Sequence, residues 1–213
     1  MVARLEVTIE GWTDGAPIPA KFAFCRPVQP GPIEMSDNRS PAIRWAKGPE
    51  GTKSYTILCV DPDVPSRPDN VNKEGMVVAA DLPRVDFYHW VLIDIPATVL
   101  ALEEGADADG ITARGKAPGA CAVGVRGVNN YTDWFAGDPD MGGDYGGYDG
   151  PCPPWNDELV HHYRFIVYAL DVPRLQLSGK FGGPEVRQAI AGHVLAEGSW
   201  VGTYTLNPGL RAD

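Results

Sequence analysis

Cationic side chains are scarce in this sequence of 213 residues, because 18 Lys and Arg stand against 28 Asp and Glu, a formal net charge of −10. A surface this acidic repels phosphate backbones and anionic lipid headgroups. We therefore expect no nucleic-acid partner and no working role at a phospholipid bilayer. Hydrophobic residues make up 44% of the chain, an ordinary fraction for a globular domain, which excludes wholesale disorder.

Long apolar runs are also absent. No uncharged stretch approaches the roughly 18 residues that a membrane-spanning helix needs, so we expect no membrane insertion. Glu6 and Glu10 stand where a signal peptide would have its apolar segment. These two observations favour a cytoplasmic location.

Only four cysteines are present, and no two of them form a CxxC pair; they are Cys25, Cys59, Cys121 and Cys152. Closely spaced cysteines are typical of zinc sites and of disulfide frameworks. The wide spacing therefore predicts reduced thiols, and we expect no metal and no cofactor.

Helix signals are few, whereas glycine and proline are abundant, at 25 and 20 residues. An alternating pattern over residues 4–10 and β-forming runs over 54–60, 87–95, 162–170 and 199–206 predict strands. Runs this apolar must be covered on both faces, which predicts a mainly β fold of packed sheets with peripheral short helices. No repeat or linker divides the chain, so we expect one domain over residues 1–213.

One helix is predicted near the C-terminus and a shorter one over residues 96–104. Pro184 suits the first turn of a helix, and Val186, Ile190 and Val194 recur at four-residue spacing. This pattern predicts a helix that carries His193 and ends at Gly198.

Residues 129–150 differ in composition from the rest of the chain. They contain five aspartates and many glycines but no Lys or Arg. We expect a solvated loop. A calcium loop is the alternative, but Gly142 occupies a ligand position and no Glu closes the loop.

Two stiff turns carry the candidate chemistry. Residues 61–66 (DPDVPS) directly follow a predicted strand, and residues 150–154 (GPCPP) precede His161. Proline fixes the backbone of such turns and so holds neighbouring side chains in place. Either turn alone is typical of a strand connection. Combined with His89 and His161 at strand edges, they indicate a site.

Several segments resemble, in chain order, the phosphatidylethanolamine-binding protein family, also called Raf kinase inhibitor-like. The matching segments are 40–45 (SPAIRW), 55–66 (YTILCVDPDVPS), 87–96 (FYHWVLIDIP), 150–154 (GPCPP), 161–170 (HHYRFIVYAL), 193–198 (HVLAEG) and 202–204 (GTY). The last two resemble the ending of the bacterial members. The resemblance implies a two-sheet antiparallel β-sandwich with a C-terminal helix. It also implies a small pocket for a phosphorylated or other anionic ligand, such as a phosphatidylethanolamine headgroup.

The resemblance assigns ten residues to that pocket: Asp61, Asp63, Pro65, His89, Gly150, Pro151, Cys152, Pro153, His161 and Tyr163. His162 stands where the family usually has Arg, which removes a permanent positive charge near the mouth. Residues 69–86 and 129–150 match the family poorly, so we expect an unusual rim.

An anion site needs hydrogen-bond donors, and His89, His161, Tyr163 and the N–H groups of the glycine-proline turn can supply them. Asp61 fits such a site if it accepts a hydrogen bond from an imidazole and keeps that ring protonated. We then expect anion affinity to rise as the pH falls through the histidine range near 6.5.

Three functional hypotheses follow. The leading one is a ligand-binding protein, for which the resemblance also implies regulation of an unknown partner protein such as a kinase. The second is a hydrolase or lyase that uses Asp61, His89 and His161 as acid–base groups, with Cys152 as the one candidate nucleophile. The sequence has no GxSxG, HExxH or P-loop motif, which favours binding over catalysis. The third is a homodimer formed through exposed sheet edges.

Overall fold

The computed structural model describes residues 2–211. Its helices are η1 (Ala20–Phe22, a 3-10 turn), α1 (Tyr131–Trp134) and α2 (Gly183–Ile190). Its strands are β1 (Ala3–Arg4), β2 (Val7–Ile9), β3 (Cys25–Arg26), β4 (Glu34–Met35), β5 (Ile43–Trp45), β6 (Ser54–Pro65), β7 (Arg84–Pro96), β8 (Ala101–Leu102), β9 (Gly119–Cys121), β10 (Gly124–Arg126), β11 (His161–Leu170) and β12 (Val194–Tyr204).

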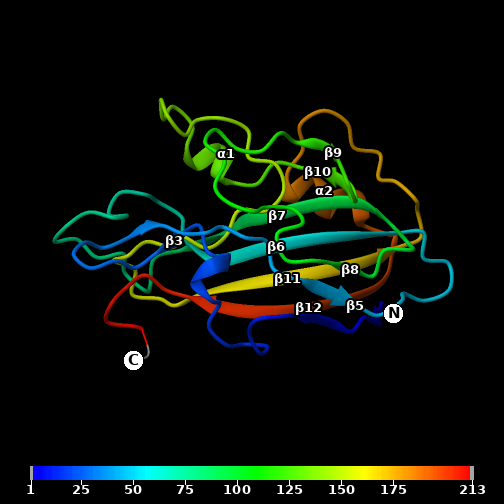
Figure 1. The fold of residues 1–213 in the computed structure, drawn as a ribbon, viewed down its shortest axis with the longest axis horizontal. Coiled ribbons are helices and arrows are strands. Elements are labelled where there is room, and N and C mark those ends of the chain that lie inside the picture. Colours follow the sequence, from blue (N-terminus) through cyan, green and yellow to red (C-terminus); the bar gives the residue numbers. More distant parts are fainter. Residues whose placement is uncertain (1, 212–213) are drawn as a thin grey trace.

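A seven-stranded sheet dominates the molecule, in the order β1-β12-β11-β6-β7-β10-β9. Figure 1 shows its four long strands, β7, β6, β11 and β12, running side by side. A three-stranded sheet, β2-β5-β8, and a two-stranded sheet, β3-β4, complete the strands. The mainly β prediction is confirmed. Two details differ from the antiparallel two-sheet expectation: the third small sheet, and the parallel pairing of β1 with β12.

Both faces of the large sheet are covered, as the apolar runs predict. On one face, alternate strand residues such as Ile57, Trp90 and Phe165 join a core that includes the N-terminal segments and β5. On the other face, the intervening residues pack under Val186 and Ile190 of α2. Period-two alternation of a strand places neighbouring residues on opposite faces, so one strand contributes to both cores.

Four of the strand predictions are confirmed. The predicted strand over residues 4–10 is instead divided between β1 and β2, which belong to different sheets, and the predicted helices also need correction. Residues 96–104 form a turn followed by β8. The C-terminal helix ends at Ile190, because Gly192 adopts a positive φ of 84° that stops it. His193 therefore lies in a turn, and residues 194–198 belong to β12, where they pair with β11.

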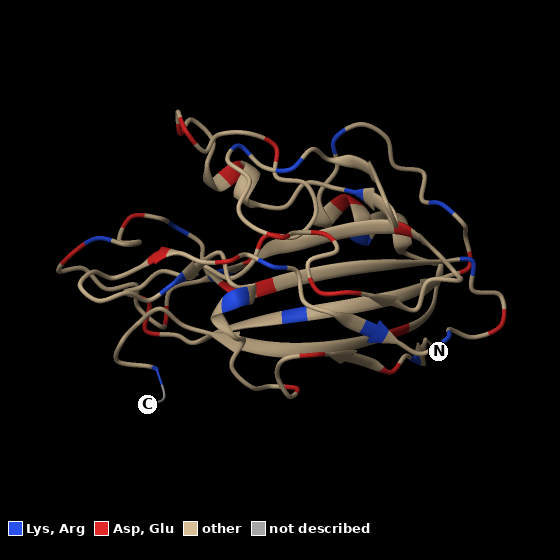
Figure 2. Cartoon of the chain, viewed as in Figure 1, with Lys and Arg blue, Asp and Glu red and all other residues tan. Residues whose placement is uncertain are grey.

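Charged residues lie mainly in the loops and at the ends of the long strands (Figure 2). None of the helices within residues 2–211 has the length and apolar character that crossing a bilayer requires.

Candidate functional site

A cavity of about 490 Å³ opens at the end of the large sheet where β6 ends and β7 begins. The start of β11, α1, the turn around Cys152 and the segment that carries β3 and β4 complete its wall. Phe87, Tyr131, Trp134 and Phe135 make much of this wall aromatic. Apolar walls with a few polar groups suit a ligand that has a polar head and an apolar body.

A chain of ion pairs lies at the base of the cavity. His161 Nδ1 is 2.7 Å from Asp61 Oδ2, and His161 Nε2 is 3.2 Å from Asp157 Oδ2. Arg84 donates to both oxygens of Asp157, at 2.6 and 3.0 Å. His161 and both carboxylates are buried. Buried charges are tolerated when they are paired in this way.

His161 is held in its protonated form. Burial lowers the pKa of this imidazole, but Asp61 and Asp157 outweigh burial and raise the pKa of His161 to about 9. Both ring N–H groups are engaged by these carboxylates, so His161 has no donor left for a ligand. The two positive charges, on His161 and Arg84, balance the two negative charges on Asp61 and Asp157.

His89 is the opposite case. Its Nδ1 lies 2.9 Å from the carbonyl oxygen of Asp149. Burial lowers the pKa of His89 to about 4, although the Asp61 charge opposes the shift. Asp61 therefore keeps His161 protonated, as expected for an imidazole at this site, but His89 is neutral. Since neither ring titrates near pH 6.5, the expected rise in affinity cannot come from protonation of a free pocket histidine.

The Tyr163 hydroxyl is a second polar group at the base. It is buried and has no hydrogen-bond partner within residues 2–211. Burial and the nearby charge of Asp61 raise the pKa of Tyr163 well above its usual value, so the hydroxyl keeps its proton. The hydroxyl is enclosed beside the Asp61 carboxylate, so it forms part of the wall behind the cavity surface.

Asp149 positions both His89 and the glycine-proline turn. Its carboxylate accepts hydrogen bonds from Asn38 and Lys116 on one oxygen and from Asn129 on the other. The Asn38 side chain in turn accepts from the Gly150 amide at 2.8 Å. A Cβ at Gly150 would lie 2.0 Å from the Phe22 carbonyl oxygen, so only glycine allows this close approach.

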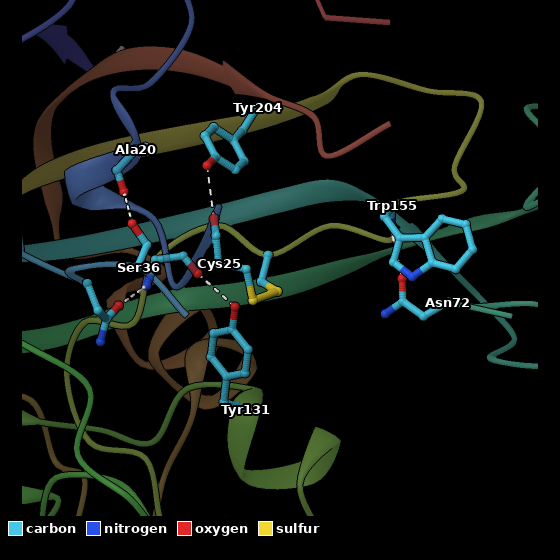
Figure 3. The surroundings of a disulfide bond; sticks show 10 residues. Ala20, Cys25, Ser36, Asn72, Tyr131, Trp155 and Tyr204 are labelled. Atoms are coloured by element: carbon cyan, nitrogen blue, oxygen red, sulfur yellow. Dashed lines mark hydrogen bonds between the residues drawn. A yellow bond between two sulfur atoms is a disulfide. The ribbon is translucent and has the colours of Figure 1, made fainter. Parts of the chain in front are cut away.

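A disulfide between Cys25 and Cys152 closes one side of the pocket (Figure 3). The prediction of reduced thiols is therefore wrong for these two cysteines, and Cys152 is no longer a candidate nucleophile. Cys59 and Cys121 are free thiols. Around the disulfide, Tyr131 donates to the Gly150 carbonyl and Tyr204 to the Cys25 carbonyl, both drawn in Figure 3.

The ten residues assigned from the sequence gather at this end of the molecule, in three groups. The cavity wall contains Asp61, Pro65, His89, Cys152, Pro153, His161 and Tyr163. Gly150 and Pro151 stand behind the wall, where their carbonyls accept hydrogen bonds. Asp63 does not line the cavity, since its carboxylate accepts from the amide and Nδ1 of the exposed His162.

The partners that hold these groups were not predictable from the sequence. Asp157, Arg84 and Asp149 carry no distinctive local pattern, although Asp157 lies four residues before His161. Residues of the segment 130–135 line the cavity, in the stretch 129–150 where the sequence predicts an unusual rim. Tyr131 lines the cavity and residues 145–150 are buried, so the solvated-loop prediction is wrong for that part.

The poorly matched segment 69–86 forms part of the rim. The Asn156 amide donates to the carbonyls of Asn70, Lys73 and Met76, and its oxygen accepts from the Asn72 amide. Val71 and Asn72 reach the cavity wall. Within residues 2–211, no group of three or more His, Cys, Asp or Glu side chains is arranged to hold a metal ion.

Comparisons with known proteins concern the family and the fold. The family model described as phosphatidylethanolamine-binding protein matches residues 8–205. A UPF0098 protein of Methanothermobacter thermautotrophicus is 32% identical over 168 residues, covering 79% of this chain and 83% of its own. One from Chlamydia muridarum is 28% identical over 200 residues, covering 94% and 98%. The crystal structure of Escherichia coli YbcL is similar, with a TM-score of 0.66, 25% identity and coverage of 95% and 99%.

Proposed function

The chain belongs to the phosphatidylethanolamine-binding protein family, and we propose that it binds a small ligand with a phosphate-like anionic head and an apolar body. The observation that carries the proposal is His89, a neutral imidazole held by the Asp149 carbonyl at the wall of a cavity that is rich in apolar and aromatic side chains. The Cys152 amide, which stands between two prolines, also donates no hydrogen bond within the described part of the chain. His89 and Cys152 line the cavity, where a ligand can contact them, whereas His161 and Asp61 are already paired.

Exposed apolar side chains at the cavity mouth support an apolar body on the ligand. Met35, Val85 and Trp134 line the cavity and are 53%, 47% and 48% exposed. Large apolar side chains with this exposure, gathered around one opening, are typical of a binding surface. The apolar part of a ligand that extends out of the cavity would cover these three side chains.

The hydrolase or lyase alternative is less well supported by the same geometry. Acid–base catalysis needs a group that can exchange a proton with a substrate. His161 has both N–H groups in ion pairs, and Cys152 is in the disulfide. Regulation of a partner protein and homodimer formation stay predictions.

Calorimetric titration with phosphoethanolamine and with phenyl phosphate tests the proposed function. We expect saturable heat with the wild type and at least about a tenfold loss of affinity in His89→Ala, about 1.4 kcal/mol of binding free energy. His193→Ala is the matched control, because His193 is remote from the cavity wall and pairs with Asp171 in a turn. An undiminished affinity in His89→Ala would contradict binding at this site.

We further propose that the protein functions in an oxidising compartment. The N-terminal sequence, in contrast, favours the cytoplasm. The Cys25–Cys152 disulfide supports this proposal, because cytosolic thiols are kept reduced. We expect two alkylatable thiols, Cys59 and Cys121, in denatured protein trapped directly from its native cells. Four alkylatable thiols would favour the cytoplasm.

A further inference from the structure

A second cavity, of about 680 Å³, lies on the face of the large sheet that α2 partly covers. We call it the β12 groove, because β12 runs between its two walls, which are β11 and the segment of β1 and β2. On β11 the groove is lined by Arg164, Ile166 and Tyr168, whereas His161 and Tyr163 line the first cavity. Neighbouring residues of a strand point to opposite faces, so the two cavities use opposite faces of β11 and share no lining residue.

Three arginines line the β12 groove: Arg4 from β1, Arg164 from β11 and Arg187 from α2. None of them forms an ion pair within residues 2–211. The chain has 28 Asp and Glu against 18 Lys and Arg, so a cation has many possible partners, and Arg84 and Arg126 are paired with buried aspartates. The guanidinium groups of the groove are therefore available to an anion from outside the chain.

The Tyr168 hydroxyl adds a donor close to two of these cations. Tyr168 lines the groove, is only 6% exposed and makes no hydrogen bond to any residue from 2 to 211. Burial raises the pKa of Tyr168, and the nearby charges of Arg187 and Arg164 lower it without outweighing burial. The hydroxyl therefore keeps its proton at neutral pH and can donate it to an acceptor. Arg187 is restrained, because its Cζ lies 5.7 Å from the centroid of the Tyr88 ring.

Carboxylates of the groove determine which anion fits. Glu197 of β12 is the register neighbour of Arg4 on β1 and of Tyr168 on β11, and its charge also acts on the Tyr168 hydroxyl. Around that hydroxyl, two guanidinium groups against one carboxylate leave one net positive charge. Of the other acidic groups in the lining, Glu6 is offset in sign by Arg4, and Asp14 accepts from a backbone amide of β12 at 2.7 Å. A monoanion balances the remaining charge, whereas a dianion exceeds it.

We propose that the β12 groove is a second binding site, for a ligand that carries a carboxylate group, held by the guanidinium groups of Arg164 and Arg187 and by the Tyr168 hydroxyl. The planar fork of a guanidinium group matches the two oxygens of a carboxylate. A phosphate dianion also has suitable oxygens, but its second charge meets Glu197. The site is independent of the first cavity, so it goes beyond the proposed function.

Titration followed by amide NMR tests the proposal with three probes of nearly equal size. Succinamate carries one carboxylate, succinate carries two and succinamide carries none. We expect succinamate to bind saturably, at least about fivefold more tightly than succinamide and no more weakly than succinate. Inorganic phosphate represents the competing anion, and we expect it to bind more weakly than succinamate.

The same spectra locate the bound probe. The backbone amides of Tyr168 and Ser199 and the Nε–H signals of Arg164 and Arg187 should shift with succinamate, because these residues line the groove. The amides of residues 130–135, on the wall of the first cavity, should stay in place.

Substitutions separate a specific site from a general effect of charge. Arg164→Gln and Arg187→Gln should each lower the affinity for succinamate at least about fivefold, and Tyr168→Phe, which removes only the hydroxyl, about threefold. Arg174→Gln is the matched control, because it removes the same charge from an exposed arginine that lines neither cavity. We expect it to change the affinity less than about twofold.

Several results would overturn the carboxylate site. They are the absence of saturable shifts, equal binding of succinamate and succinamide, tighter binding of phosphate, and shifts confined to the first cavity. An equal loss of affinity in Arg174→Gln and Arg187→Gln would also overturn it, because net charge alone would then explain the binding. The location of the shifts is measured on the wild type, so it decides the question even if a variant fails to fold. None of these results bears on ligand binding in the first cavity.

Discussion

Replacing both Cys25 and Cys152 with serine should lower the free energy of unfolding by about 4 kcal/mol, because the disulfide between them closes a loop with a sequence separation of 127 residues. A cross-link of this span removes much of the chain entropy of the unfolded state. For a protein of this length, the change corresponds to a melting temperature lower by roughly 10 °C. Urea unfolding of the oxidised wild type and of the double variant measures it.

The folded state should survive this change, because other contacts hold the same segment. The amides of Phe24 and Cys25 both donate to the Pro151 carbonyl, and Tyr204 donates to the Cys25 carbonyl. Reduced wild type should therefore match the double variant in stability. Cys121→Ser is the control, and we expect it to change the free energy of unfolding by less than about 0.5 kcal/mol. Equal stability of oxidised and reduced wild type would contradict a stabilising disulfide.

This disulfide also shows what the sequence cannot reveal. Cys25 and Cys152 are brought together by the contact between the β3 segment and the glycine-proline turn, which no local pattern records. The absence of CxxC pairs excludes a dense disulfide framework, but it does not exclude one long-range bond. The long strands, in contrast, were predictable because each carries a continuous β-forming run ended by a turn residue.

The end of α2 illustrates the limit of periodicity. Val186, Ile190 and Val194 recur at helical spacing, yet only the first two lie on the helix. Gly192 stops the helix, and Ala196 pairs with Ala169 of β11 and Ala3 of β1. Pairing with two strands distant in sequence satisfies the backbone of residues 194–204, so tertiary contacts outweigh the local helical pattern.

The candidate site was predictable in position but not in protonation. The two proline-rich turns and the strand-edge histidines indicate where the polar groups gather. Which histidine is charged depends on Asp157 and Arg84, neither of which the sequence pattern singles out. It also depends on Asp149, whose carbonyl oxygen fixes the tautomer of His89.

The opposed states of the two pocket histidines predict a maximum of stability near pH 6.5. The pKa of His161 is about 9 in the folded protein against about 6.5 when unfolded, so its contribution is full below pH 6.5 and is lost as the pH rises through 9. The pKa of His89 is about 4 when folded, so its contribution is present above pH 6.5 and is lost as the pH falls through 4. Each shift corresponds to about 3 kcal/mol.

Urea unfolding at pH 4, 6.5 and 9 measures the loss of stability on both the acid and the alkaline side of this maximum. We expect His161→Gln to be less stable than the wild type at pH 6.5, and to lose about 3 kcal/mol less than the wild type between pH 6.5 and 9. His89→Gln should show the corresponding flattening between pH 6.5 and 4. His193→Ala, at an exposed turn, should keep the wild-type profile. If His161→Gln and the wild type lost equal stability on the alkaline side, the ion-pair chain from Asp61 to Arg84 would not hold a charged imidazole. His161 would then have an N–H group available to donate to a ligand, which the ion pairs with Asp61 and Asp157 prevent in the structure.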